Sequence, residues 1–100
     1  MSNKDKHIDD WFYDRGITEN GTAIGQATKT LEEVAELFDA LNRNHTADIM
    51  DAIGDIYVTL RGVCVTADIN MDECIDQAYN EIKDRKGYLN DVGTFIKEIK

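Results

Sequence analysis

Acidic side chains are concentrated in two short stretches near the middle of the chain. Glu32, Glu33 and Glu36 lie within one stretch, and Asp51 and Asp55 lie in the next. Residues three or four apart occupy the same face of a helix. Carboxylates held together repel one another unless a cation neutralises them, and oxygen ligands without His or Cys suit Mg²⁺ or Mn²⁺ rather than zinc. The pattern therefore predicts a divalent-metal site, whose chemistry would be charge neutralisation on phosphates and activation of water.

A solvated acidic face is the simpler interpretation, because charged runs on helices usually face water. The second acidic stretch argues against it. Along the line of Asp51 and Asp55, the next residues on that side are Val58, Gly62 and Val65. Beyond Asp55 the segment is hydrophobic nearly all round, which is typical of a helix covered on both sides. Either the acids lie at the mouth of a cleft, or a second subunit covers that side.

Four helices and a short tail are expected to position these groups. Apolar residues recur three and four apart, and the absence of proline permits long helices. Thr46 is a plausible N-cap, and Asn70 followed by Glu73 has the spacing of a capping box. We therefore predict helices over about 4–14, 22–43, 46–67 and 70–86, and a hairpin or extended arm over 87–100.

Length and charge exclude several classes of protein. The chain has 100 residues, which is the length of one domain. Its net charge of -9 disfavours binding to nucleic acid or to an anionic membrane surface. No apolar run approaches the ~18 residues of a membrane span. The N-terminus lacks the apolar segment of a signal peptide, so a cytoplasmic location is expected. There, Cys64 and Cys74 are expected to be small core residues rather than a disulfide.

Three blocks of sequence carry a resemblance to a known family. They are LEEVAEL at 31–37, DAIGDIYVTL at 51–60 and AYNEIKDRKG at 78–87. In this order they resemble the MazG-like nucleotide pyrophosphohydrolases of the all-α NTP pyrophosphatase superfamily. The resemblance implies an all-α fold, a four-helix bundle assembled by oligomerisation, with residues 1–100 as a single domain. It also implies Mg²⁺-dependent cleavage of ribo- or deoxyribonucleoside triphosphates to a monophosphate and pyrophosphate, with Mn²⁺ as a substitute.

The resemblance further implies roles for individual residues. Of the glutamate doublet, Glu33 is favoured as the general base, with Glu32 as the alternative. The metal ligands implied are Glu32, Glu33, Glu36 and Asp55, and the polar residues implied near the triphosphate are Asn80, Lys83 and Arg85. Lys83 and Arg85 also have a simpler interpretation, as cations that suit a helix C-terminus.

One position departs from the family pattern. The second motif usually places a glutamate three residues before its aspartate, and that position is Ala52 here. Asp51 is the nearest carboxylate and is within about 40° of Asp55 on the helix surface. We therefore expect Asp51 to serve as the ligand in its place.

The expected partners are a nucleoside triphosphate and further copies of the same chain, as a dimer or tetramer. A rival hypothesis is an acidic helical interaction or inhibitor module that masks a basic surface without catalysis, for which net charge alone would suffice. Convergence of like charges on two helices favours the enzyme, because a masking protein has no need to bring them together.

Overall fold

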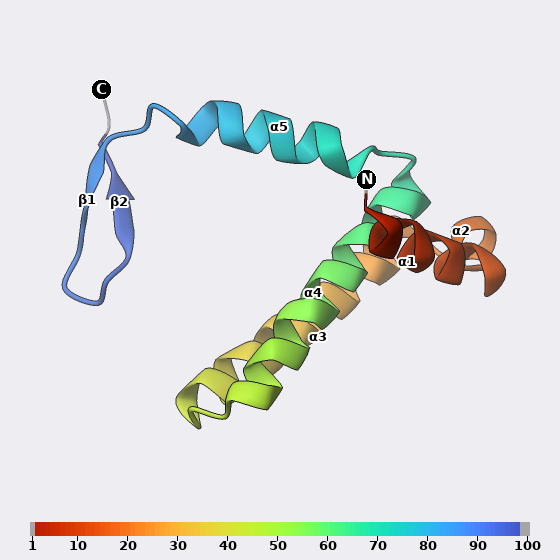
Figure 1. Ribbon diagram of the computed structural model, residues 1–100, viewed down its shortest axis with the longest axis horizontal. Helices are drawn as coiled ribbons and strands as arrows, with labels where there is room; N and C mark the ends of the chain where they lie inside the picture. The colour runs from red at the N-terminus through yellow and green to blue at the C-terminus, as the bar shows by residue number, and fades with distance from the viewer. Residues whose placement is uncertain (1, 99–100) are drawn as a thin grey trace.

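The computed structural model describes residues 2–98, and these form five helices followed by a two-stranded hairpin (Figure 1). The all-α class predicted from the sequence is confirmed. No helix in the described range combines the length and apolar character needed to cross a membrane. The elements are α1 (Asn3–Asp14), α2 (Ile17–Asn20), α3 (Ala23–Asn42), α4 (Thr46–Ala67), α5 (Met71–Ile82), β1 (Gly87–Leu89) and β2 (Phe95–Lys97).

Helices α3 and α4 form an antiparallel pair that is the body of the molecule (Figure 1). Ala40 and Ala52, which are 1 % and 3 % exposed, form part of the small buried core. Small side chains allow two helix backbones to approach closely, so they suit the end of the pair near the connecting turn. Within that turn Asn44 adopts a left-handed conformation, which asparagine tolerates better than most residues.

Helix α1 crosses α4 and is attached by a buried polar network. The guanidinium of Arg61, 5 % exposed, donates through Nε and Nη2 to the two carboxylate oxygens of Asp9 at 2.7 and 2.6 Å. The Tyr57 hydroxyl donates to Asp5 at 2.8 Å and accepts from Arg61 at 3.3 Å. Phe12, the most buried residue of α1, packs so close to Gly62 that a Cβ there would lie 2.8 Å from its ring. The contact fixes α1 across the C-terminal half of α4.

Helix α5 leaves the end of α4 and projects away from the α3–α4 pair (Figure 1). Its start matches the sequence prediction, because the Asn70 side chain accepts a hydrogen bond from the Glu73 backbone N–H at 3.0 Å. The tail forms the predicted hairpin, in which Gly87 pairs with Lys97 and Leu89 with Phe95. Residues 99 and 100 of the predicted tail lie outside the described part of the chain.

Local details differ from the sequence predictions. The N-cap of α4 is His45, whose Nδ1 accepts from the Asp48 N–H at 3.3 Å, so Thr46 is instead the first helical residue. The short helix α2 was not predicted, because four residues are too few to carry a periodic pattern. Cys64 is buried as expected, but Cys74 is exposed because α5 projects from the body.

Large apolar side chains are exposed on every long helix of the described chain. On α5 they form one stripe, in which Ile75, Tyr79 and Ile82 are each more than half exposed. On the α3–α4 pair, Leu31 and Phe38 are exposed to a similar or greater extent. Single exposed apolar residues are ordinary, but a helical stripe of them marks an interaction surface.

Candidate metal centre

Three carboxylates from two helices converge between α3 and α4. Glu33 and Glu36 come from consecutive turns of α3, and Asp55 comes from α4. One carboxylate oxygen from each of the three lies within 4.8 Å of the other two. Glu33 and Asp55 are partly buried, and Glu36 is exposed at the outer edge. These three carboxylates are close enough together for a single divalent ion to bind all of them.

Packing next to the carboxylates determines how closely the two helices approach. On one side, the Thr30 hydroxyl donates to the Thr59 hydroxyl at 2.8 Å across the helix interface. Thr30 precedes Glu33 by one turn, and Thr59 follows Asp55 by one turn. On the other side the buried residue Ala52 leaves no bulk between the helices. The Thr30–Thr59 hydrogen bond and the small side chain of Ala52 therefore keep the carboxylates close together despite their mutual repulsion.

The electrostatics of the cluster reflect this crowding. A side-chain hydrogen bond shared with Glu36, together with burial and the charges of Glu36 and Asp55, raises the pKa of Glu33. Burial, followed by the charges of Asp51 and Glu36, raises the pKa of Asp55. Both shifts disfavour the ionised carboxylates that a bound cation would stabilise.

A divalent cation suits this donor set. The Oε2 atom of Glu33 is buried and has no hydrogen-bond partner among the described residues. A buried polar atom without a partner costs free energy, and coordination to a cation removes that cost. All three candidate ligands are carboxylate oxygens, which Mg²⁺ and Mn²⁺ prefer. The residues present thus match the ion that the sequence analysis predicts.

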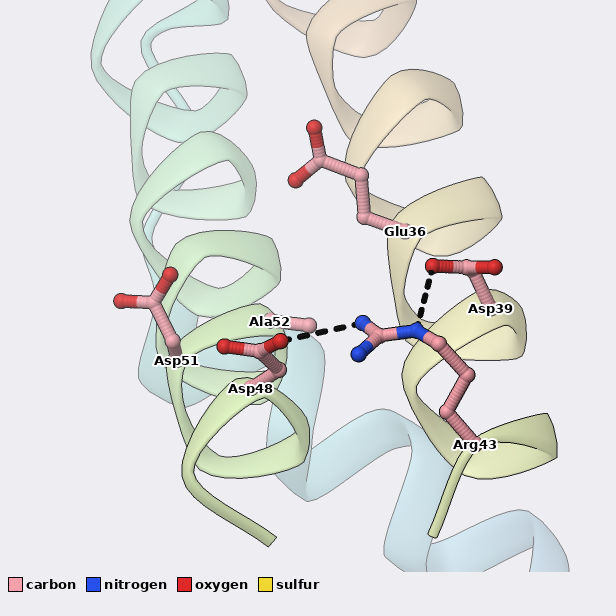
Figure 2. A pocket seen from close by; sticks show the side chains of 6 residues that line it. All are labelled: Glu36, Asp39, Arg43, Asp48, Asp51 and Ala52. Atoms are coloured by element: carbon pink, nitrogen blue, oxygen red, sulfur yellow. Dashed lines mark hydrogen bonds and ion pairs between the residues drawn. The ribbon is translucent and has the colours of Figure 1, made fainter. Parts of the chain in front are cut away.

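A polar hollow of about 270 Å³ adjoins the cluster on the side of the α3–α4 turn. Glu36 belongs to both the hollow and the cluster. Figure 2 shows the guanidinium of Arg43 lying between the two helices, where its Nε donates to Asp39 and its Nη2 to Asp48, each at 3.0 Å. The residues that line the hollow are Glu36, Asp39, Arg43, Asp48, Asp51 and Ala52.

Two residues of the second sequence motif, Asp51 and Ala52, line this hollow. The Ala52 methyl group points toward the guanidinium of Arg43, whereas the Asp51 carboxylate points away from it (Figure 2). Asp51 lies outside the three-carboxylate cluster but close enough to Asp55 to raise its pKa. Asp51 therefore adds negative charge beside the cluster.

Other predicted site residues lie apart from the cluster within one chain. Glu32 is exposed and ion-paired with Lys29 at 2.9 Å, because it lies on the adjacent side of α3. Asn80 is on α5, Lys83 caps the end of that helix, and Arg85 follows it. All three are exposed on the projecting α5 arm. The chain by itself does not bring its predicted substrate residues to its acidic cluster.

Sequence reasoning overlooked three residues of this region. Arg43 stands alone at the end of α3 with no motif around it, and only the turn shows that it faces both helices. Thr30 and Thr59 are each one turn from a predicted ligand, which was a usable signal. Their pairing across 29 positions depends on the rotation of both helices, which the sequence does not state.

Without divalent ions, we expect the protein to become more stable as the pH is lowered modestly from neutral. Since folding raises the pKa values of Glu33 and Asp55, the stability linked to their protonated forms is present at low pH and is lost as the pH rises through the folded pKa values. Folding lowers the pKa of Asp48, whose contribution is lost at still lower pH. Melting temperatures in a chelator across a pH series measure this effect. Saturating Mg²⁺ should weaken or reverse the slope, and identical slopes with and without Mg²⁺ would contradict it.

The two aspartates beside the cluster are expected to differ in importance. Asp51→Asn should weaken Mg²⁺ binding several-fold, because Asp51 adds negative charge next to Asp55. Asp48→Asn should have little effect on Mg²⁺ binding, because Asp48 is paired with Arg43. Calorimetric Mg²⁺ titration of the two variants compares them directly. Equal and small effects would mean that Asp51 is only a surface charge.

The chain is also similar to known proteins. Residues 1–81 match the phosphoribosyl-ATP pyrophosphohydrolase family. Over 55 residues the chain is 36% identical to an uncharacterized 18.2 kDa protein from the rep-hol intergenic region of Haemophilus phage HP1. That match covers 55% of this chain and 34% of the phage protein, so the chain spans about a third of its relative's length. No solved structure matches the chain.

The family match covers both helices that carry the acidic cluster and nearly all of α5. The family match is consistent with the helical fold and with the converging carboxylates. The chain belongs to the phosphoribosyl-ATP pyrophosphohydrolase family, within the MazG-like all-α NTP pyrophosphatase superfamily that its three sequence blocks predict.

Proposed function

We propose that this chain is a Mg²⁺-dependent pyrophosphohydrolase that cleaves a nucleoside triphosphate to a nucleoside monophosphate and pyrophosphate. We also propose that residues 1–100 act as one domain of this kind. The observation that carries the proposal is the convergence of Glu33, Glu36 and Asp55 from two helices to within 4.8 Å. Such an arrangement is costly for a protein that binds no cation, and it suits a reaction that needs charge neutralised on phosphates.

Glu33, Glu36 and Asp55 would hold the ion, with Asp51 adding negative charge beside Asp55. Bound Mg²⁺ supplies neutralisation of phosphate charge and lowers the pKa of a coordinated water. Glu36 is the most exposed of the three and faces the hollow, so its side of the cluster is open to a substrate. The enclosed side, next to Thr30 and Thr59, would exclude bulk water.

Glu33 is the best candidate for the general base. A base works best when its pKa lies close to the working pH, and the Glu36 hydrogen bond and burial both raise the pKa of Glu33. Glu32 is held by Lys29 outside the cluster, so it is the weaker of the two candidates.

A second copy of the chain would complete the site. Helix α5 presents an apolar stripe that includes Ile75 and Ile82, and the α3–α4 pair presents apolar residues of its own. If α5 of one copy packs against α3 and α4 of another, its basic end would approach the acidic cluster of that copy. Lys83 and Arg85 could then contact the phosphates that the ion binds, which one chain alone does not allow.

The decisive experiment is a substrate panel. The purified protein is incubated with Mg²⁺ and each common ribo- and deoxyribonucleoside triphosphate, and with phosphoribosyl-ATP. Monophosphate and pyrophosphate are the products expected from the substrate that fits. Release of diphosphate and phosphate instead would contradict the proposed reaction.

The rival hypothesis of an acidic masking module makes a different prediction. It requires no specific cation, so a Mg²⁺ titration should then give no saturable binding at the Glu33–Glu36–Asp55 cluster. We expect saturable binding that Glu36→Gln removes. A matched charge change on α1, Asp10→Asn, should leave it unaltered, because Asp10 is exposed and paired with Lys6 away from the cluster.

The assembly itself can be tested directly. A chain of 11.3 kDa should sediment at micromolar concentration with at least twice that mass, because its exposed apolar stripes need partners. Ile82→Asp should shift the mass toward the monomer, since it places a charge in the proposed interface. Glu19→Lys, an exposed change on α2, serves as a control. A monomer mass for the unmodified chain would contradict the proposed assembly.

A further inference from the structure

Arg43 has an unusual position beside the candidate metal centre. It caps the C-terminal end of α3, and its guanidinium reaches across the hollow toward α4 (Figure 2). Asp39 and Asp48 hold it from either side at 3.0 Å, one from each helix. Among the described residues that line this hollow, Arg43 is the one that carries positive charge. The side chain is nevertheless 48% exposed, so a solute in the hollow can reach it.

The guanidinium of Arg43 has further N–H donors that could bind a ligand. Arginine has five N–H donors, and the two hydrogen bonds that Arg43 forms with described residues use Nε and one hydrogen of Nη2. Both N–H groups of Nη1 are therefore left for a ligand. The planar fork of a guanidinium suits two oxygens of one phosphate, which is why arginine binds phosphates more specifically than lysine.

The neighbouring residues leave room for such a ligand. Ala52 contributes only a methyl group to the wall, so no large side chain at that position fills the hollow. Glu36 is shared between the hollow and the three-carboxylate cluster, so a chain of phosphates bound at the cluster would extend toward Arg43. The three carboxylates and one divalent ion together carry a net charge of about -1, which does not attract a phosphate chain. A further positive charge is needed there.

We propose that Arg43 is a phosphate-binding residue, whose guanidinium contacts the pyrophosphate portion of the substrate next to the metal centre. The inference rests on the proposed function, because it takes the substrate to be a nucleotide held by a single cation at the cluster. Asp39 and Asp48 form ion pairs with the guanidinium and so compete with a phosphate for it. The guanidinium thereby supplies directed N–H donors to the phosphate oxygens, which a metal ion does not provide.

Calorimetry with inorganic pyrophosphate in saturating Mg²⁺ tests the assignment without turnover. Arg43→Gln should weaken pyrophosphate binding about ten- to hundredfold, the loss expected for a charge-assisted hydrogen bond. The same variant should still bind one Mg²⁺ per chain in a separate titration. The matched control is the double variant Asp39→Asn with Asp48→Asn, which removes both ion pairs but keeps the guanidinium.

The two variants separate a phosphate contact from a purely structural role. If Arg43 only stabilises the turn, both should lower the melting temperature and weaken pyrophosphate binding to the same extent. If it binds phosphate, pyrophosphate affinity should fall in Arg43→Gln and be kept or increased in the double variant. Equal losses, unchanged affinity in Arg43→Gln, or two Mg²⁺ per chain would overturn the inference alone. Absence of Mg²⁺ binding to the unmodified chain would overturn the proposed function as well.

Discussion

Glu36→Gln and Asp55→Asn are each expected to lower the rate of nucleotide hydrolysis by about a hundredfold or more. Each removes one of the three carboxylates that converge between α3 and α4. An amide keeps the shape of the side chain but not its charge, so the remaining two ligands should bind the cation much more weakly. Helix content should be unchanged, since neither residue belongs to the buried core.

Turnover at saturating and at limiting Mg²⁺ measures this loss, and far-ultraviolet circular dichroism checks the fold. Asp10→Asn is the control, because that carboxylate is exposed on α1 and pairs with Lys6. Activity near that of the unmodified chain in both variants would contradict the metal centre.

The same substitutions should act in the opposite direction on stability. In metal-free buffer, Asp55→Asn removes a partly buried carboxylate that other acids surround, so the melting temperature should rise. With saturating Mg²⁺ the unmodified chain should gain more stability than the variant, because only its native state binds the ion tightly. Thermal unfolding with and without Mg²⁺ measures both effects. A lower melting temperature for Asp55→Asn in metal-free buffer would mean that the carboxylate has a structural role.

Arg61→Met is expected to cause the largest loss of stability, about 3 kcal/mol in the free energy of unfolding. Arg61 is 5 % exposed and holds both oxygens of Asp9, with Tyr57 and Asp5 beside it. Methionine fills a similar volume but leaves two partly buried carboxylates without a cation. Removing one partner of such a network costs more than the network itself contributes, because the remaining charges stay desolvated.

Chemical denaturation of the full chain measures the change. Lys6→Met is a matched control, because Lys6 and Asp10 form an exposed pair on α1, and it should cost less than about 1 kcal/mol. Arg61→Met combined with Asp9→Asn should be less destabilising than the sum of the two single changes, since the second substitution removes the unpaired carboxylate. Additive losses would mean that Asp9 and Arg61 do not interact.

Much of the local structure follows from the sequence alone. Apolar residues recurring three and four apart predict the long helices, and the Asn70 to Glu73 spacing predicts the start of α5. These signals act over one or two turns, so neighbouring residues suffice to determine them. The three sequence blocks likewise predict the superfamily, which the family match confirms. The acidic face of each helix also follows from the sequence, since Glu33 and Glu36 are three residues apart and Asp51 and Asp55 are four apart.

Tertiary structure decided which of those acids meet. Periodicity gives the face of each helix but not its rotation against a neighbour, and that rotation depends on contacts such as Thr30 with Thr59 and on the small core residues Ala40 and Ala52. This rotation places Glu33 in the acidic cluster, whereas Glu32 lies outside it and pairs with Lys29.

Other features of the fold also depend on contacts between residues that are far apart in the sequence. The Arg61–Asp9 network joins residues 52 positions apart, and no local pattern links them. Arg43 faces the acidic hollow because the α3–α4 turn reverses the chain beside it. Lys83 and Arg85 lie away from the cluster because α5 leaves the end of α4 and projects from the body (Figure 1). A sequence determines helices through contacts between near neighbours, whereas a site shared between helices is determined by how their side chains pack at a distance.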